Sequence, residues 1–202
     1  MAQIPNRAFE EMQKAAKSRL VGRDPDEIAA KAGARFDRDK SLFVLPSLGK
    51  GIAISYPSYA LEADMQPWHQ LVILHYLDLA DGTLLSDREI AFGQLRDGMV
   101  RGTDFDRRAE AAIRRLGQQS EAQIRSLCAS LGASLPPSNA DICAVFPFLP
   151  NCPITMKLWL ADDEFDASGR LLLNASTDHY LTIEDAVTAG SILLDALGLA
   201  KL

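Results

Sequence analysis

The sequence predicts a single α+β domain, in which helices and two separate groups of short strands share one core. The chain of 202 residues is long enough for one hydrophobic core and short for two. Its 48% hydrophobic and 24% charged residues are typical of an ordinary globular protein. Strand-like segments gather in two regions, with helical patterns between them and at both ends, which indicates the α+β class. We therefore expect one domain over residues 1–202, with small antiparallel sheets and about six helices packed around a buried central helix.

The first third of the chain predicts two helices followed by a small antiparallel sheet. Apolar residues recur at helical spacing near the N-terminus, at Phe9, Met12, Ala16 and Leu20. A second helix should begin at Asp24, with Pro25 in the first helical position, where its missing N–H costs nothing. Between residues 34 and 64 the pattern changes to the short segments ARF, SLFVL and GIAISY, separated by turn-forming Pro and Gly residues.

The middle of the chain is predicted to be mainly helical. Residues 68–79 are apolar on nearly all sides, and such a helix is normally buried against several neighbours, so we expect it to be the central helix. A short strand, REIAF, should follow. The next helix is expected to have Thr103 as its cap, Asp106 in the capping-box position and Gly117 at its end. Its inward face should be formed by Phe105, Ala109, Ile113 and Leu116.

The last third predicts a helix, three strands and a final helix. Cys128 should be a core residue, because it lies on one helical face with Ile124, Leu127 and Leu131. The segment LPPSNAD ends the helical pattern, and ICAVF, ITMKLWL and RLLL follow as strands. The final helix should have Thr182 as its N-cap and Asp185 in the capping box. We expect it to bury Val187, Gly190, Leu194 and Leu197.

Composition and charge narrow the functional classes. The formal net charge of -6 argues against nucleic-acid binding, which needs clustered Lys and Arg to neutralise phosphates. The longest apolar run, LVILHYL, is far shorter than the roughly 20 residues that a membrane span requires. The N-terminal segment lacks the apolar region of a secretory signal, and Cys128, Cys143 and Cys152 lack paired spacing. We therefore expect a cytoplasmic protein with three reduced thiols, no bound metal, and neither nucleic acid nor membrane as a partner.

The segment LWLADDEFDASGR, residues 158–170, places four carboxylates directly after a strand-like run. Glu164 and Asp166 match ligand positions of an EF-hand calcium loop, but Ala175 stands where that loop requires a bidentate carboxylate. In a strand, Asp162, Glu164 and Asp166 would share one face, where they could hold magnesium or act as catalytic acids. The alternative is a solvated strand end that runs into a turn at DASG, and the weak repulsion between exposed charges favours this interpretation.

The three histidines provide one candidate ligand. His69 and His75 are six residues apart, about 240° around a helix, so they do not form a zinc site of the HExxH type. His75 is either a hydrogen-bonded core residue or the axial ligand of a large planar cofactor, and its apolar neighbours favour the core. His179 follows Asp178, which could orient it. The chain contains no GxSxG nucleophile motif, no P-loop and no GxGxxG fingerprint.

The strand before the acids carries the remaining candidates. Alternation along a strand places Asp163 on the same face as Trp159 and Phe165. If that face is inward, Asp163 must be hydrogen-bonded or paired, because an isolated buried carboxylate is costly. An aromatic wall with a polar anchor is typical of small-molecule pockets. We therefore select His75, Trp159, Asp163 and Glu164 as candidate ligand-binding residues, in a pocket where the buried helix meets this strand, and assign no catalytic residue.

Two longer segments resemble a known family. They are LVILHYLDLADGTLLSDREIAFGQLRDG and the region from FPFLPNCPITMKLWLADDEF to YLTIED. Their His-Tyr-Leu helix, Pro-rich FPFLP segment and tryptophan strand leading into DDEF resemble the uncharacterised bacterial and archaeal family named domain of unknown function 3786, over residues 66–190. Some members carry an N-terminal four-cysteine iron–sulfur domain like that of corrinoid iron–sulfur proteins, and this chain has no such cysteine segment. The resemblance implies an accessory or cofactor-handling role in anaerobic metabolism, with an iron–sulfur or corrinoid protein as partner.

Three functional hypotheses follow. The first is a non-catalytic accessory domain that binds a small-molecule or cofactor ligand, whose identity the sequence leaves open. The second is a hydrolase-like enzyme with Asp163 and Glu164 as general acid and base, which requires at least one of them in a cleft with a raised pKa. The third is a protein-interaction module without a pocket. Burial of Asp163 or Glu164 discriminates among these hypotheses, and exposure of both acids would favour the third.

Overall fold

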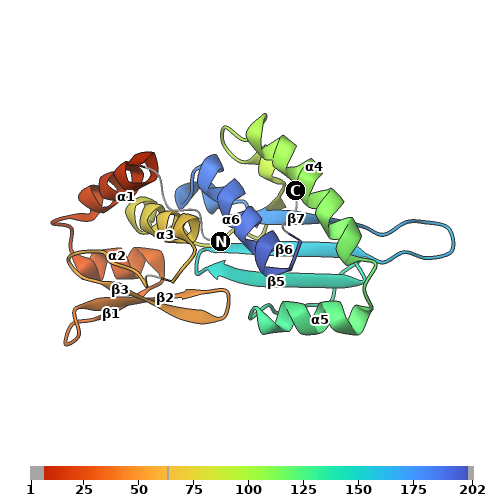
Figure 1. The fold of residues 1–202 in the computed structure, drawn as a ribbon, viewed down its shortest axis with the longest axis horizontal. Coiled ribbons are helices and arrows are strands. Elements are labelled where there is room, and N and C mark those ends of the chain that lie inside the picture. Colours follow the sequence, from red (N-terminus) through yellow and green to blue (C-terminus); the bar gives the residue numbers. More distant parts are fainter. Residues whose placement is uncertain (1–6, 63, 200–202) are drawn as a thin grey trace.

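Helices and two small antiparallel sheets make up the fold (Figure 1). The computed structural model describes residues 7–62 and 64–199. Its first elements are α1 (Arg7–Leu20), α2 (Pro25–Ala32), β1 (Arg35–Asp37), β2 (Leu42–Ser47), β3 (Lys50–Ser55) and α3 (Pro67–Leu79). Then follow β4 (Glu89–Ile90), the short 3-10 helix η1 (Phe92–Gln94), α4 (Arg101–Leu116), α5 (Glu121–Ser130), β5 (Ile142–Leu149), β6 (Cys152–Trp159), β7 (Ser168–Asn174), the second 3-10 helix η2 (Thr177–His179) and α6 (Ile183–Ala196). The predicted α+β class is confirmed.

The two sheets meet where the turn after β2 touches β5. The first sheet has the order β1-β2-β3, and the second has the order β4-β7-β6-β5. The N–H of Leu48, in the turn between β2 and β3, donates to the carbonyl of Pro147 in β5 at 2.8 Å. This bond places the N-terminal sheet beside one edge of the C-terminal sheet.

Helix α3 is the central helix that the sequence predicts. It buries Leu71, Val72, Ile73, Leu74, Tyr76 and Leu77, and it contacts α1, α2 and α6. The hydroxyl of Tyr76 donates to the carbonyl of Ala32 in α2 at 2.7 Å, and its ring stacks on Tyr180 at a centroid distance of 5.6 Å. These contacts hold α3, and with it His75, in place between the two halves of the chain.

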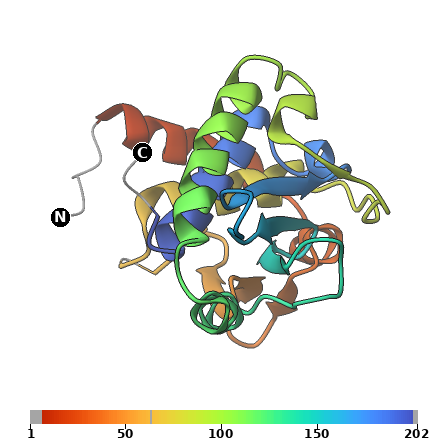
Figure 2. The same cartoon turned by 90° about the vertical axis from the view of Figure 1, so that its right-hand side faces the viewer.

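Helices α4 and α6 lie on the same side of the four-stranded sheet and run side by side (Figures 1 and 2). Gly190 of α6 allows this approach, since a Cβ there would lie 2.5 Å from Cζ of Phe105 in α4. The predicted inward residues of α4 and α6 are buried, as is Cys128 in α5. Within the described ranges, no helix has the length and apolar character that a membrane crossing requires.

The predicted N-cap of α4 is wrong, whereas its predicted end at Gly117 and the capping box of α6 are confirmed. Helix α4 begins at Arg101, so Thr103 lies inside its first turn instead of capping it. The carboxylate of Asp106 accepts the N–H groups of Phe92 (3.0 Å) and Gly93 (2.9 Å), because the start of η1 presents donors that lack a partner within that helix. The capping box of Thr182 and Asp185 forms as predicted at the start of α6.

Candidate functional site

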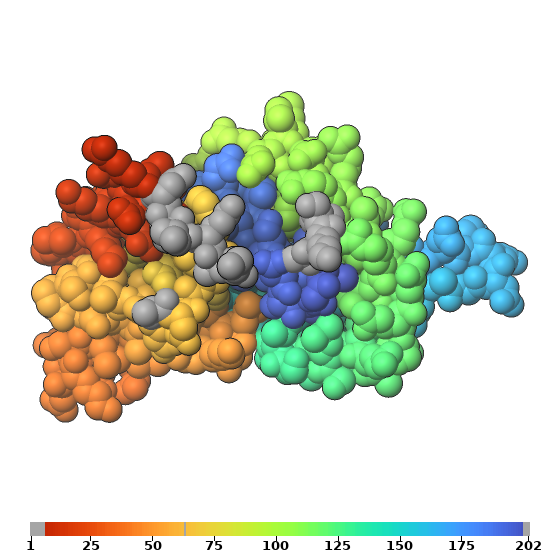
Figure 3. All heavy atoms as spheres, viewed as in Figure 1, coloured from red at the N-terminus to blue at the C-terminus, as the bar shows by residue number. Residues whose placement is uncertain are grey.

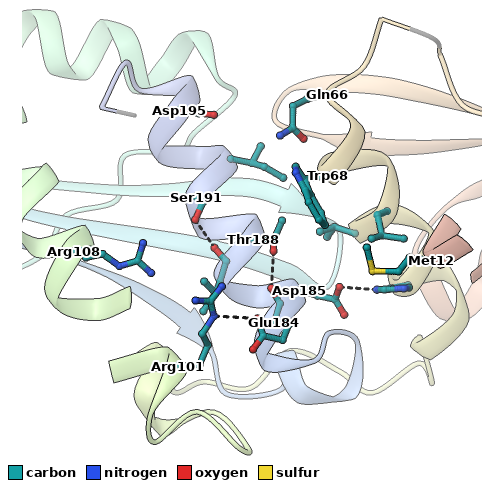
Figure 4. A pocket seen from close by; sticks show the side chains of 15 residues that line it. Met12, Gln66, Trp68, Arg101, Arg108, Glu184, Asp185, Thr188, Ser191 and Asp195 are labelled. Atoms are coloured by element: carbon teal, nitrogen blue, oxygen red, sulfur yellow. Dashed lines mark hydrogen bonds and ion pairs between the residues drawn. The ribbon is translucent and has the colours of Figure 1, made fainter. Parts of the chain in front are cut away.

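A groove of about 500 Å³ runs over α6, between α1 and α3 on one side and α4 on the other (Figure 4). We call it the α6 groove. Its apolar lining includes Met12 of α1, Trp68 and Leu71 of α3, and Ile192 of α6. Trp68 is 45% exposed and Met12 is 40% exposed, so large apolar side chains remain uncovered inside a hollow. An apolar hollow with a few polar groups is the usual form of a small-molecule site.

His75 lines this groove and is oriented by a buried carboxylate. Its Nδ1 lies 2.7 Å from Oδ1 of Asp185, whose side chain is 8% exposed. The other oxygen of Asp185 accepts a hydrogen bond from the hydroxyl of Thr182 at 2.7 Å. An ionised carboxylate only accepts hydrogen bonds, so Nδ1 carries the proton in this pair. When the imidazole is neutral, Nε2 therefore keeps the lone pair that a ligand can use.

The two arginines of the α4 wall have carboxylate partners. Nε of Arg101 lies 3.0 Å from Oε2 of Glu184 on α6, and Nε of Arg108 lies 3.1 Å from Oδ2 of Asp104 on its own helix. Figure 4 shows both guanidinium groups on the side of the groove opposite Trp68. The α4 wall is therefore polar, and both of its arginines are paired with carboxylates of the protein, although Arg108 shares Asp104 with Arg107.

The structure separates the four residues selected from the sequence. His75 is in the α6 groove, whereas Trp159, Asp163 and Glu164 are not among the residues that line it. The indole of Trp159 donates to the carbonyl of Asn139 at 3.1 Å. Asp163 and Glu164 are exposed in the loop between β6 and β7, which projects from the body of the molecule (Figures 1 and 3). These three residues do not meet His75, and a ligand-binding role for any of the four stays a prediction.

The acidic run forms a solvated turn. Oδ1 of Asp162 accepts the N–H groups of Glu164 (2.9 Å) and Phe165 (2.7 Å), and these bonds lower the pKa of the Asp162 carboxyl. Phe165 is 70% exposed. The predicted shared strand face of Asp163, Phe165 and Trp159 is wrong, because β6 ends at Trp159 and strand alternation does not continue into the loop.

The other two histidines have partners of their own. Nε2 of His69 lies 2.9 Å from Oγ of Ser47, and burial lowers the pKa of His69 to about 4. Nδ1 of His179 lies 2.7 Å from Oδ2 of Asp81, so the residue that orients it is not the adjacent Asp178. The hydrogen bond from His179 lowers the pKa of Asp81 to about 2.

Sequence reasoning missed two features of the groove, the pairing of Asp185 with His75 and the exposure of Trp68. One signal for the pairing was present. A histidine in an apolar helix needs a polar partner, and a capping-box carboxylate has a second oxygen to offer. Among residues 7–62 and 64–199, no three His, Cys, Asp or Glu side chains gather as a metal site.

Comparison with known proteins identifies a family. No curated protein and no solved structure matches the chain. The family model described as Domain of unknown function (DUF3786) matches residues 24–196. The match extends beyond the predicted range of 66–190 and includes every part of the α6 groove except Met12 of α1. The chain therefore belongs to the DUF3786 family of domains of unknown function.

Proposed function

We propose that this domain binds a small organic molecule or cofactor in the α6 groove, with His75 as its main polar contact. The observation that carries the proposal is the His75–Asp185 pair on the wall of a groove that also exposes Trp68. A carboxylate bound to one imidazole nitrogen fixes the ring and directs the other nitrogen toward a ligand. Apolar walls with a few oriented polar groups supply affinity and specificity together.

The acidic loop between β6 and β7 does not support the hydrolase-like hypothesis. Asp163 and Glu164 are exposed, so they lack the enclosed cleft in which a carboxyl acts as a general acid. Nothing in the loop supports the hydrolase-like hypothesis. Exposure of both acids favours an interaction surface at the loop, while the α6 groove, which none of the loop acids line, supports ligand binding.

We further propose that the ligand or partner belongs to corrinoid or iron–sulfur metabolism in a reducing cytoplasm. The support is the family resemblance, together with three buried free cysteines. A metal-centred planar cofactor brings its own chelating ring, so it needs only one axial nitrogen from the protein. His75 fits that role, because metal-bound histidines usually donate their other ring N–H to a carboxylate.

The fluorescence of Trp68 tests ligand binding directly. The chain has two tryptophans, so Trp159→Phe leaves Trp68 as the only tryptophan fluorophore. We expect at least one compound from a metabolite and cofactor library to change this fluorescence with saturation. His75→Ala should abolish the response, and the matched control His179→Ala, outside the groove, should retain it. A library without a saturating compound, or equal losses in both variants, would contradict the proposal.

Hydroxocobalamin, as one member of that library, tests the corrinoid part separately. If Nε2 of His75 replaces the water on cobalt, the visible absorption spectrum should change with the wild-type protein and not with His75→Ala. An unchanged spectrum rejects the corrinoid ligand and leaves the binding of other ligands to be judged by fluorescence.

A further inference from the structure

The floor of the α6 groove presents hydrogen-bond acceptors. The hydroxyl of Thr188 donates to the carbonyl of Glu184 at 2.7 Å, and the hydroxyl of Ser191 donates to the carbonyl of Val187 at 2.9 Å (Figure 4). Each hydroxyl has a single proton, so both offer only lone pairs to a ligand. Nε2 of His75 adds a third acceptor when the imidazole is neutral. A ligand that forms hydrogen bonds with these three acceptors must itself supply the donors.

Negative charge without a permanent cation lies at both ends of this floor. At one end, the carboxylate of Asp185 is bonded to the imidazole of His75 and the hydroxyl of Thr182. At the other end is Asp195, which forms no ion pair with the part of the chain that the structure describes. The arginines of the α4 wall already pair with other carboxylates, Arg101 with Glu184 and Arg108 with Asp104, which Arg108 shares with Arg107. Ten residues of helix separate the two acids, about 15 Å at 1.5 Å per residue.

The space between these ends is apolar. Trp68 stands over it, with its ring held edge-on against Phe9 at a centroid distance of 5.0 Å and an angle of 78°. Leu71 and Ile192 line the same stretch. An exposed indole face attracts cations and also packs against aliphatic chains. The groove therefore combines two acidic ends with an apolar middle.

We propose that the ligand of the α6 groove is an elongated organic cation, an aliphatic chain with ammonium groups at both ends, of the long-diamine or polyamine class. The inference rests on ligand binding in the α6 groove, as proposed above, and names a ligand class that is an alternative to the corrinoid cofactor. One ammonium group donates to His75 Nε2 beside Asp185, and the other pairs with Asp195. The methylene groups between them pack against Trp68 and Leu71. Each ammonium supplies both the positive charge and the N–H donors that complement the acceptors of the floor.

Three ten-carbon compounds of equal length test this inference: the α,ω-diamine, the diol and the dicarboxylate. Each is titrated at low salt against the Trp159→Phe protein, with Trp68 fluorescence as the readout. We expect the diamine to bind at least about tenfold more tightly than the other two, and added salt to weaken it. Asp195→Asn should weaken diamine binding about fivefold, the effect of one exposed ion pair, without changing diol binding. The matched control Asp163→Asn should leave diamine binding unchanged, and thermal melts establish that each variant is folded.

The possible outcomes distinguish failure of the cation inference from failure of the α6 groove as a ligand site. Preference for the dicarboxylate, or equal binding of all three compounds, overturns the cation inference and supports the groove as a ligand site. Absence of binding by all three compounds also overturns the inference. The proposed function itself fails only if the wider library gives no saturating response that depends on His75.

Discussion

The α6 groove and the loop between β6 and β7 both contain carboxylates, and the two sets differ in what surrounds them. The loop has four acids in five positions, and Asp163 and Glu164 face water. The groove has one buried carboxylate, Asp185, bonded to both His75 and Thr182. An exposed acid is tolerated almost anywhere, whereas a buried one persists only with partners. The comparison teaches that burial and bonded partners, and not the number of acids, distinguish a carboxylate built into the fold from one in a solvated turn.

The largest expected effect is that of Asp185→Ala on stability. The change removes the hydrogen bonds that Asp185 accepts from Thr182 and His75, and bonds to charged groups contribute about 1.5–3 kcal/mol each. We expect the free energy of unfolding to fall by about 3 kcal/mol, measured by urea denaturation. A double-mutant cycle with His75→Ala should give a coupling of about 1–2 kcal/mol. Additive losses would show that the two side chains do not support each other.

The second prediction concerns pH and assigns the acid sensitivity of the fold to His69 of α3, away from the acidic loop. Burial lowers the pKa of His69 from 6.5 to about 4. The unfolded chain therefore takes up this proton at a higher pH than the folded chain, and the free energy of unfolding falls as pH decreases from 6.5 to about 4. We expect a loss of about 2 kcal/mol over this range, after allowance for partial exposure of the ring.

Two variants separate this effect from that of the acidic loop. His69→Gln should flatten the dependence between pH 6.5 and 4 in urea melts. Asp162→Asn should leave this range unchanged, because the lowered pKa of Asp162 adds stability that is lost only below its ordinary value of 3.8. If Asp162→Asn instead flattened the dependence of the unfolding free energy on pH in this range, the acid sensitivity would lie in the loop. That result would contradict its assignment to His69.

A smaller effect is expected for Trp159→Phe. The change removes the hydrogen bond from the indole to the carbonyl of Asn139 and the contact with the guanidinium of Arg170, whose carbon lies 5.6 Å from the ring centroid. We expect a loss of about 1 kcal/mol in denaturant melts and no change in the binding of any ligand of the α6 groove. Weakened ligand binding in this variant would show that Trp159 influences the groove.

The smallest effect is expected at the tip of the loop. Phe165 is 70% exposed and Asp163 is exposed, so Phe165→Ser and Asp163→Ala should leave the unfolding midpoint within measurement error. Thermal melts of the two variants, recorded beside Asp185→Ala, check this directly. A clear loss in either variant would mean that the loop packs against the body of the protein.

The sequence by itself determined most of the secondary structure and the class of the fold. The apolar pattern of residues 68–79 predicted α3 as the central helix, and the strand segments of both sheets were predicted in order. Thr182 and Asp185 were predicted as the capping box of α6. These features depend on residues within one or two helical turns or within a single strand, so spacing along the chain is enough to predict them.

Only the tertiary structure decided which side chains meet. His75 and Asp185 are 110 residues apart in sequence, and their contact requires α3 and α6 to pack together. Asp106 binds η1 instead of completing a cap, because packing brings the start of η1 to α4. The acids of the loop are exposed to solvent because no helix or strand covers them. Their spacing in the sequence could not predict this exposure. Burial and long-range pairing depend on how the elements pack, and local sequence pattern does not specify that packing.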